Sequence, residues 1–163
     1  MAGSVKNPLE KIKHFCAYQE RSHFEIKQKL YLLGLRYADV EALLAKLIEE
    51  NYLNEERFAQ SFTRGKFNLK KWGRVKIKHE LAVKKVSSAN IKTSLKEINE
   101  DIYRQTLEQL AEKKWLLLLD EQPVSRQAKT TQYLLQKGYE LPLIQNALKV
   151  IIAKENKNSM LEF

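Results

Sequence analysis

The apolar positions of this chain recur with helical spacing, and one pattern of spacings occurs three times. Each copy has a leucine four residues before a reference position, and apolar residues 6, 10 and 13 positions after it. The reference positions are Gly34, Lys85 and Gly138, which lie 51 (85 − 34) and 53 (138 − 85) residues apart. The apolar members are Leu30, Val40, Leu44 and Leu47, then Leu81, Ile91, Leu95 and Ile98, then Leu134, Ile144, Leu148 and Ile151. Self-similarity at a fixed period indicates a repeat architecture.

Each copy is typical of a helix, a turn and a second helix. Gly34 and Gly138 stand where the first helix should end, and glycine readily adopts the left-handed backbone that closes a last helical turn. Lys85 occupies the same place in the second copy, which predicts a strained or differently shaped turn there. The spacing that follows each turn is one face of an amphipathic helix.

A further helical stretch precedes each pair, at 9–19, 55–67 and 101–119. Ser22 and Glu25 form a capping-box pattern at a helix start, and Asn54 can cap the helix that begins at Glu55. The prediction is an all-α fold of three tandem three-helix repeats, at 1–50, 51–98 and 99–155. Repeats that contact only their neighbours form an elongated, curved body. The pattern is weak in 156–163, which predicts a flexible, frayed tail.

Composition supports this fold class and narrows the setting. The 163 residues include only five glycines, three prolines and one cysteine, Cys16, which we expect to be a small buried hydrophobe. The longest uninterrupted apolar run, Trp115 to Leu119, is far shorter than the roughly 18 residues that a membrane span needs. The first residues also lack the apolar stretch of a secretory signal. A cytoplasmic, monomeric protein without a membrane segment is expected.

The distribution of charge singles out the middle of the chain. The net charge is +9, and the segment 64–85 holds nine basic residues and one acid, Glu80. That segment therefore carries +8 of the total, whereas acidic residues prevail in 39–56. A focused basic field attracts polyanions or acidic protein surfaces.

We therefore hypothesise a site for DNA phosphates or acidic partner residues within this segment. Its candidate residues are Arg64, Lys66, Lys70, Lys71, Trp72, Arg74, Lys76 and Lys78. Phosphate neutralisation by such residues gives sequence-independent affinity that falls with salt, and Trp72 could stack on an unpaired base. The alternative is a solvated helix face that keeps the protein soluble, with Trp72 packed in the core.

Signals of catalysis are missing from the sequence. His14, His23 and His79 lie on different predicted helices without a partner at metal-ligand spacing, so no metal site is expected. Gly65 and Gly73 are not part of a phosphate-binding loop. We expect no cofactor and no enzymatic activity.

Residues of the second repeat carry a family resemblance. The stretch from Asn51 to Ala59, with Leu53, Arg57, Phe58 and Ala59, resembles the Leu-(Asn/Asp)-Asp-x-Arg-Phe-Ala signature of RecX proteins. Downstream, 70–81 is similar to the basic, glycine-containing helix of that family. Glu55 replaces an Asp of the signature, and Lys85 stands where many members have Gly. The resemblance covers roughly 21–152.

The resemblance implies a regulator that binds RecA filaments on single-stranded DNA. Members of the family inhibit the ATPase, strand-exchange and coprotease activities of that recombinase. Two other functions fit the residues themselves. One is a stand-alone helical nucleic-acid-binding module, and the other is an adaptor that docks through the acidic stretch 39–56.

Overall fold

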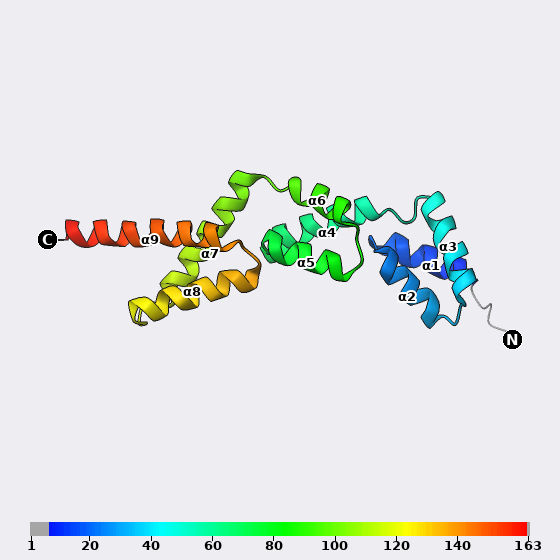
Figure 1. Cartoon of the computed structure of the whole chain (residues 1–163), viewed down its shortest axis with the longest axis horizontal. Coiled ribbons are helices and arrows are strands. Elements are labelled where there is room, and N and C mark those ends of the chain that lie inside the picture. The colour runs from blue at the N-terminus through cyan, green and yellow to red at the C-terminus, as the bar shows by residue number, and fades with distance from the viewer. Residues whose placement is uncertain (1–6, 163) are drawn as a thin grey trace. The chain divides into compact units, whose positions relative to one another are not determined.

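The computed structural model describes residues 7–162, and these residues form nine α-helices and no strand (Figure 1). The helices are α1 (Pro8–Tyr18), α2 (His23–Leu32), α3 (Tyr37–Glu49), α4 (Glu55–Lys70), α5 (Arg74–Val83), α6 (Ser88–Lys96), α7 (Glu100–Leu117), α8 (Pro123–Lys137) and α9 (Leu141–Leu161). The all-α prediction is confirmed. The expectation about a signal segment concerns mainly residues 1–6, which lie outside the described part.

The three predicted turns share one backbone geometry. Gly34, Lys85 and Gly138 all have positive φ, at 87°, 61° and 97°. In each turn the following residue donates its N–H to the carbonyl of the leucine four residues before the reference position, at 3.1–3.3 Å. These are the bonds of the motif that ends a helix with a left-handed residue. The repeat register is therefore correct, and Lys85 adopts a conformation that costs a side-chain-bearing residue about 1–2 kcal/mol.

The helix starts follow the predicted capping chemistry. Ser22 accepts a hydrogen bond from the Glu25 backbone N–H at 3.1 Å, and the Glu25 carboxylate accepts from the Ser22 N–H at 2.9 Å. Asn54 accepts from the Arg57 N–H at 2.8 Å. The Arg57 guanidinium pairs with Glu20, which joins the start of α4 to the segment after α1. Both caps satisfy N–H groups that a helix leaves without internal partners.

One predicted core position differs. Leu95 is only half-buried, whereas the equivalent Leu44 and Leu148 are buried. Ser94 is fully buried in its place, and its hydroxyl accepts a hydrogen bond from Thr63 at 3.0 Å while donating to the Ile91 carbonyl. The prediction that Leu95 shares the buried face is wrong, because α6 turns Ser94 toward Thr63 of α4.

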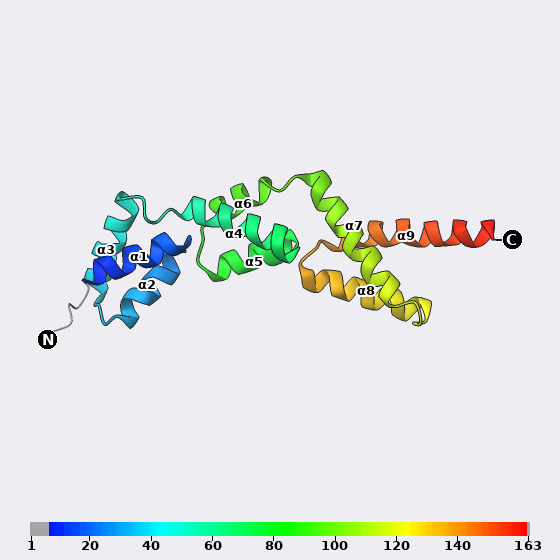
Figure 2. The ribbon, with the colours of Figure 1, turned by 180° about the vertical axis from the view of Figure 1, so that it is seen from behind.

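The chain divides into two compact units, and each unit includes part of the middle repeat. The first comprises the described residues up to Arg64 together with Glu80–Glu97. Here α1 and α2 pack beside α3 (Figures 1 and 2). Their core consists of Ile12, Cys16, Ile26, Leu30, Val40, Leu44, Leu47 and Leu53. Cys16 is a buried hydrophobe as expected, and burial raises the pKa of its thiol to about 11.

The second unit comprises Gly65–His79 and the described residues from Ile98 onward. Helices α7, α8 and α9 contact one another (Figure 2). Tyr103 lies at the centre of an aromatic row, 5.8 Å from Phe67 and 5.1 Å from Tyr139 between ring centroids. Offset or tilted ring pairs at these distances are favourable. The row therefore joins the end of α4 to the third repeat.

The last helix extends beyond the point where the sequence pattern weakens. Helix α9 continues through Leu161, so the predicted tail at 156–163 is helical as far as that residue, and its flexibility stays a prediction. Its last side chains, including Met160 and Leu161, are exposed. The end of α9 is held by backbone hydrogen bonds and has no buried face. Apolar periodicity reports only a buried face, so the sequence pattern could not reveal this part of the helix.

Candidate partner-binding surface

The candidate residues converge on the turn between α4 and α5. Lys71 leaves α4 with a left-handed backbone, φ 58°, and its carbonyl accepts a hydrogen bond from the Tyr139 hydroxyl at 2.8 Å. The Gly73 N–H donates to the Lys137 carbonyl at 2.8 Å, and the Val75 N–H donates to the Gly138 carbonyl at 2.9 Å. The α4–α5 turn is therefore fastened by backbone bonds to the α8–α9 turn.

Two glycines allow this close approach. A Cβ on Gly73 would lie 2.3 Å from the Gly138 carbonyl oxygen, and a Cβ on Gly138 would lie 2.3 Å from the Lys76 Cβ. Real Cβ atoms do not tolerate such distances. Gly73 therefore serves close packing between the two turns.

Trp72 of this turn lies under two lysines, one from α4 and one from α5. The ammonium groups of Lys66 and Lys76 stand 4.8 and 4.3 Å from the centre of its ring. Trp72 is half-buried. It is therefore not a core residue, as one of the two sequence interpretations had it, and its ring is not fully open for a base to stack on. The electron-rich indole face holds both cations at the surface.

Further lysines gather at the end of α4. Lys70 and Lys71 are exposed, and the Lys137 ammonium donates to the Lys70 carbonyl at 3.2 Å. Sequence reasoning missed Lys137, although the repeat register places it at the position equivalent to Lys84. We call Lys66, Lys70, Lys71, Trp72, Lys76 and Lys137 the basic surface. Cations at the end of a helix also interact favourably with its dipole.

Two candidates lie apart from the basic surface. Lys78 is exposed on α5, but residues two apart on a helix do not share a face, so it points away from Lys76. Arg64 is exposed on α4 and belongs to the first unit.

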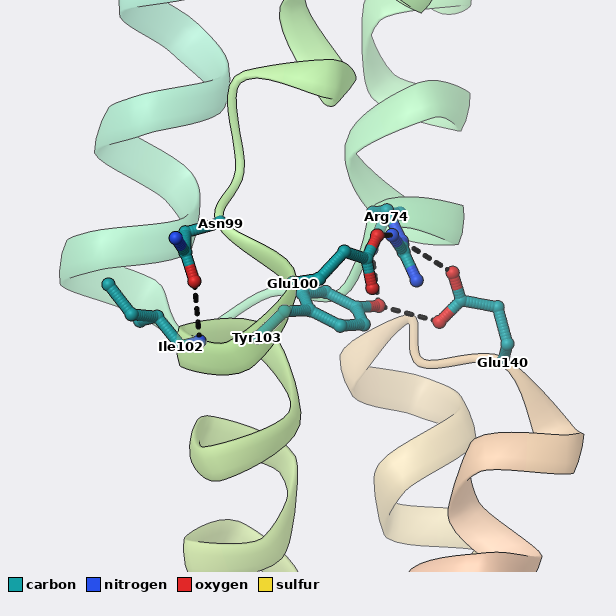
Figure 3. Close-up of polar contacts among 6 residues, drawn as sticks. All are labelled: Arg74, Asn99, Glu100, Ile102, Tyr103 and Glu140. Atoms are coloured by element: carbon teal, nitrogen blue, oxygen red, sulfur yellow. Dashed lines mark hydrogen bonds and ion pairs between the residues drawn. The ribbon is translucent and has the colours of Figure 1, made fainter.

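Arg74 has a different environment from the lysines (Figure 3). Its Nε donates to Glu140 at 2.7 Å, a second guanidinium nitrogen donates to Glu100, and the group lies 4.1 Å above the Tyr103 ring. The Tyr103 hydroxyl donates to the Glu140 carboxylate at 2.6 Å and accepts from the backbone N–H of Arg74 at 3.0 Å. A guanidinium held by two carboxylates is a structural partner, since a phosphate would have to displace them.

The electrostatics of this network follow from its burial. Burial alone would lower the pKa of Arg74, but the hydrogen bonds to Glu140 and Glu100 outweigh it and raise the pKa. Burial is the main cause that raises the pKa of Tyr103, and the hydrogen bond to Glu140 raises it further. Arg74 stays charged and Tyr103 stays a donor at any ordinary pH.

The first unit contains an equivalent contact between repeats. Within the second repeat, Glu55 at the start of α4 accepts from the Ser87 N–H at 2.9 Å, the Ser87 hydroxyl at 3.0 Å and the Asn90 amide at 2.6 Å. The equivalent contact, between the first and second repeats, is an ion pair. Lys84 pairs with Glu25 at 2.6 Å. We call this contact the first junction, and the contact around Gly73, Arg74 and Gly138 the second junction.

The remaining chemistry of the described residues is sparse. Within 7–162 no group of three or more His, Cys, Asp or Glu side chains is arranged to hold a metal ion. No helix in this range has the length and apolar character to cross a membrane.

Comparison with known proteins identifies the family. The family model described as "RecX, second three-helix domain" matches 54–95, and that described as "RecX, third three-helix domain" matches 101–148. The regulatory protein RecX of Vibrio parahaemolyticus is 31% identical over 125 residues, which are 77% of this chain and 79% of that protein. The chain belongs to the RecX family. The resemblance inferred from 51–59 and 70–81 is confirmed.

Most of the chain also matches two longer RecX proteins. Regulatory proteins RecX of Oceanobacillus iheyensis and Halalkalibacterium halodurans are 24% and 28% identical and match 88% of this chain. The chain spans about half their length, 53% and 54%. A crystal structure of RecX from Lactobacillus salivarius superposes with a TM-score of 0.80 at 23% identity, over 89% of this chain and 94% of that one. It confirms the fold of tandem three-helix RecX domains.

Proposed function

We propose that this protein binds RecA filaments on single-stranded DNA and inhibits the recombinase, ATPase and coprotease activities of RecA. Membership of a family whose relatives are named regulatory proteins carries the proposal. The basic surface supplies a site of the right charge. No catalytic role is assigned to any residue.

The charge of the basic surface suits it to bind phosphates or acidic side chains of such a filament. Within the described residues, Lys70, Lys71, Lys76 and Lys137 have no carboxylate within ion-pair distance, so their charge is available to a partner. Phosphates or acidic side chains of the filament would be held by these cations. Arg74 contributes indirectly, because its pairing with Glu100 and Glu140 fixes the turn that presents them.

The test is RecA ATP hydrolysis on single-stranded DNA with increasing amounts of the native protein or of Lys70→Glu/Lys71→Glu/Lys76→Glu. Arg74 is left intact, because its reversal would break the second junction. The native protein should inhibit hydrolysis, and the triple variant should inhibit at least roughly tenfold less well, as expected when several phosphate contacts are reversed.

A matched variant distinguishes the effect of the basic surface from the effect of the net charge of the protein. Lys92→Glu/Lys96→Glu/Lys113→Glu changes the net charge equally at exposed positions outside the basic surface. It should inhibit like the native protein. If the native protein binds DNA but leaves hydrolysis unchanged, the stand-alone nucleic-acid-binding function replaces the proposal.

A further inference from the structure

The first unit carries a groove that the proposed function does not use. It lies between α1 and α2 and has a volume of about 320 Å³. Ile12, Phe15, Tyr18 and Leu33 belong to its lining, and Leu33 and Tyr18 are 38% and 80% exposed. A volume of this size is at the lower end of ligand pockets and fits one large apolar side chain with its flanking backbone.

The charges around the groove have a single sign. Lys11 and Lys29 line it, and no carboxylate does so among the described residues. The Arg21 guanidinium lies 3.8 Å above the Phe15 ring, and its Nε is buried without a hydrogen-bond partner in the described chain. Lys29 stands 5.4 Å from the same ring. The groove therefore combines an apolar floor with an unbalanced positive rim.

We propose that this groove binds an acidic peptide segment that inserts one large apolar side chain. Charge complementarity selects the occupant: acidic residues on either side of the inserted side chain would face Lys11 and Lys29. Arg21 already covers a face of Phe15, which leaves His14 and Tyr18 as the other aromatic rings of the lining. Stacking of a nucleic-acid base on these rings is therefore the competing outcome of the test. The inference is independent of the basic surface, which belongs to the second unit.

The test uses the whole chain and fluorescence anisotropy. The probe is a short fluorescein-labelled peptide of Asp and Glu around one central Phe. Two comparison peptides replace the central Phe by Ala, or all acids by Lys. Only the first peptide should bind well, and its affinity should fall as salt rises, because exposed charges are screened.

Variants locate the binding. Lys11→Glu/Lys29→Glu should lower the affinity for the peptide by roughly tenfold or more through charge reversal. Leu33→Asp should lower it by removing an apolar side chain from the lining. Lys46→Glu/Lys92→Glu, at exposed positions of the same unit, and Lys70→Glu/Lys71→Glu/Lys76→Glu should bind like the native protein. Circular dichroism melting checks that each variant is folded.

Three results would overturn the inference. They are absence of peptide binding, equal binding of the Ala-centred peptide, and unchanged affinity in folded groove variants. Tighter groove-dependent binding of labelled oligothymidine would assign the groove to nucleic acid instead. RecA inhibition by Lys11→Glu/Lys29→Glu, assayed in parallel, reports on the proposed function separately.

Discussion

The two junctions are built on one register yet differ in charge. Because the repeats are 51 and 53 residues apart, Glu25 corresponds to Lys76, and Lys84 corresponds to Lys137. In the first junction Lys84 and Glu25 form an ion pair at 2.6 Å. In the second, both equivalent positions are basic, and Lys76 lies over Trp72 instead. One scaffold therefore gives a neutral contact in the first unit and a basic surface in the second.

The junctions also differ in how closely their turns approach. Gly73 and Gly138 let the second junction form backbone-to-backbone contacts. Their equivalents in the first junction, Ser22 and Lys85, carry side chains, and that junction is joined by the side-chain bond between Lys84 and Glu25. The second junction should therefore be the more sensitive to added volume, and the first to loss of a carboxylate.

The largest expected effect is from Gly138→Ala. The added Cβ meets Lys76 at 2.3 Å and also occupies a left-handed backbone, so we expect a loss of about 2–5 kcal/mol in the free energy of unfolding. Gly34→Ala is the matched control, since its Cβ would meet open space and only the backbone strain of about 1–2 kcal/mol remains. Urea denaturation measures both. Equal losses would mean that the close approach at the second junction is absent.

The hydroxyl of Tyr103 is the next largest contributor. Tyr103→Phe removes the bond to Glu140 and leaves the Arg74 N–H without its acceptor, which should cost about 1–3 kcal/mol. Phe58 is the fourth residue of α4, as Tyr103 is of α7, so the variant makes the starts of these two helices more alike. An unchanged midpoint in urea would show that water replaces the hydroxyl at no cost.

Glu25→Gln probes the carboxylate of the first junction. Burial alone would raise the pKa of Glu25, but hydrogen bonds from Lys84 and the Ser22 backbone outweigh it and lower the pKa. A folded-state pKa below the unfolded value, about 4.3, stabilises the protein above that value, and the stabilisation is lost as pH falls through the folded pKa. The variant should lose about 0.5–1 kcal/mol at pH 7.

The pH dependence separates a charge effect from a packing effect. Because Glu25→Gln cannot titrate there, its deficit relative to the native protein should shrink as pH falls from about 5 toward 3. Thermal unfolding across this range is the measurement. A deficit that stays constant with pH would contradict the ion-pair account.

The last expected effect is a gain in stability, similar in size to the loss in Glu25→Gln. Lys85→Gly relieves the left-handed strain at φ 61°, offset in part by the greater freedom of glycine in the unfolded chain. We expect stabilisation by about 0.5–1 kcal/mol. Lys85→Ala should give no comparable gain, since alanine has the same backbone penalty.

The repeat and its turns were predictable because they depend on local chemistry. Leu30, Leu81 and Leu134 mark a buried turn of helix, and the left-handed residue four positions later follows from helix geometry. Leu95 was mispredicted because periodicity counts apolar residues but does not detect a buried polar pair such as Thr63 and Ser94.

The candidate surface was predictable in charge but not in arrangement. A run of basic residues identifies Lys70, Lys71 and Lys76, yet the sequence does not say that Arg74 has partners 26 and 66 residues away. Lys137 lies outside the basic run and reaches Lys70 only through the second junction. Such contacts depend on packing between repeats, which local patterns do not record.

The most direct test of the central claim is to give the second junction the charge of the first. Lys76→Glu places an acid where the first junction has Glu25, and should leave unfolding in urea within about 1 kcal/mol of the native protein. Binding to a preformed RecA filament on single-stranded DNA should weaken by roughly tenfold at low salt. Lys92→Glu, an equal charge change at an exposed site of the first unit, should bind like the native protein. A folded Lys76→Glu variant with native affinity would contradict the assignment of filament binding to the basic surface.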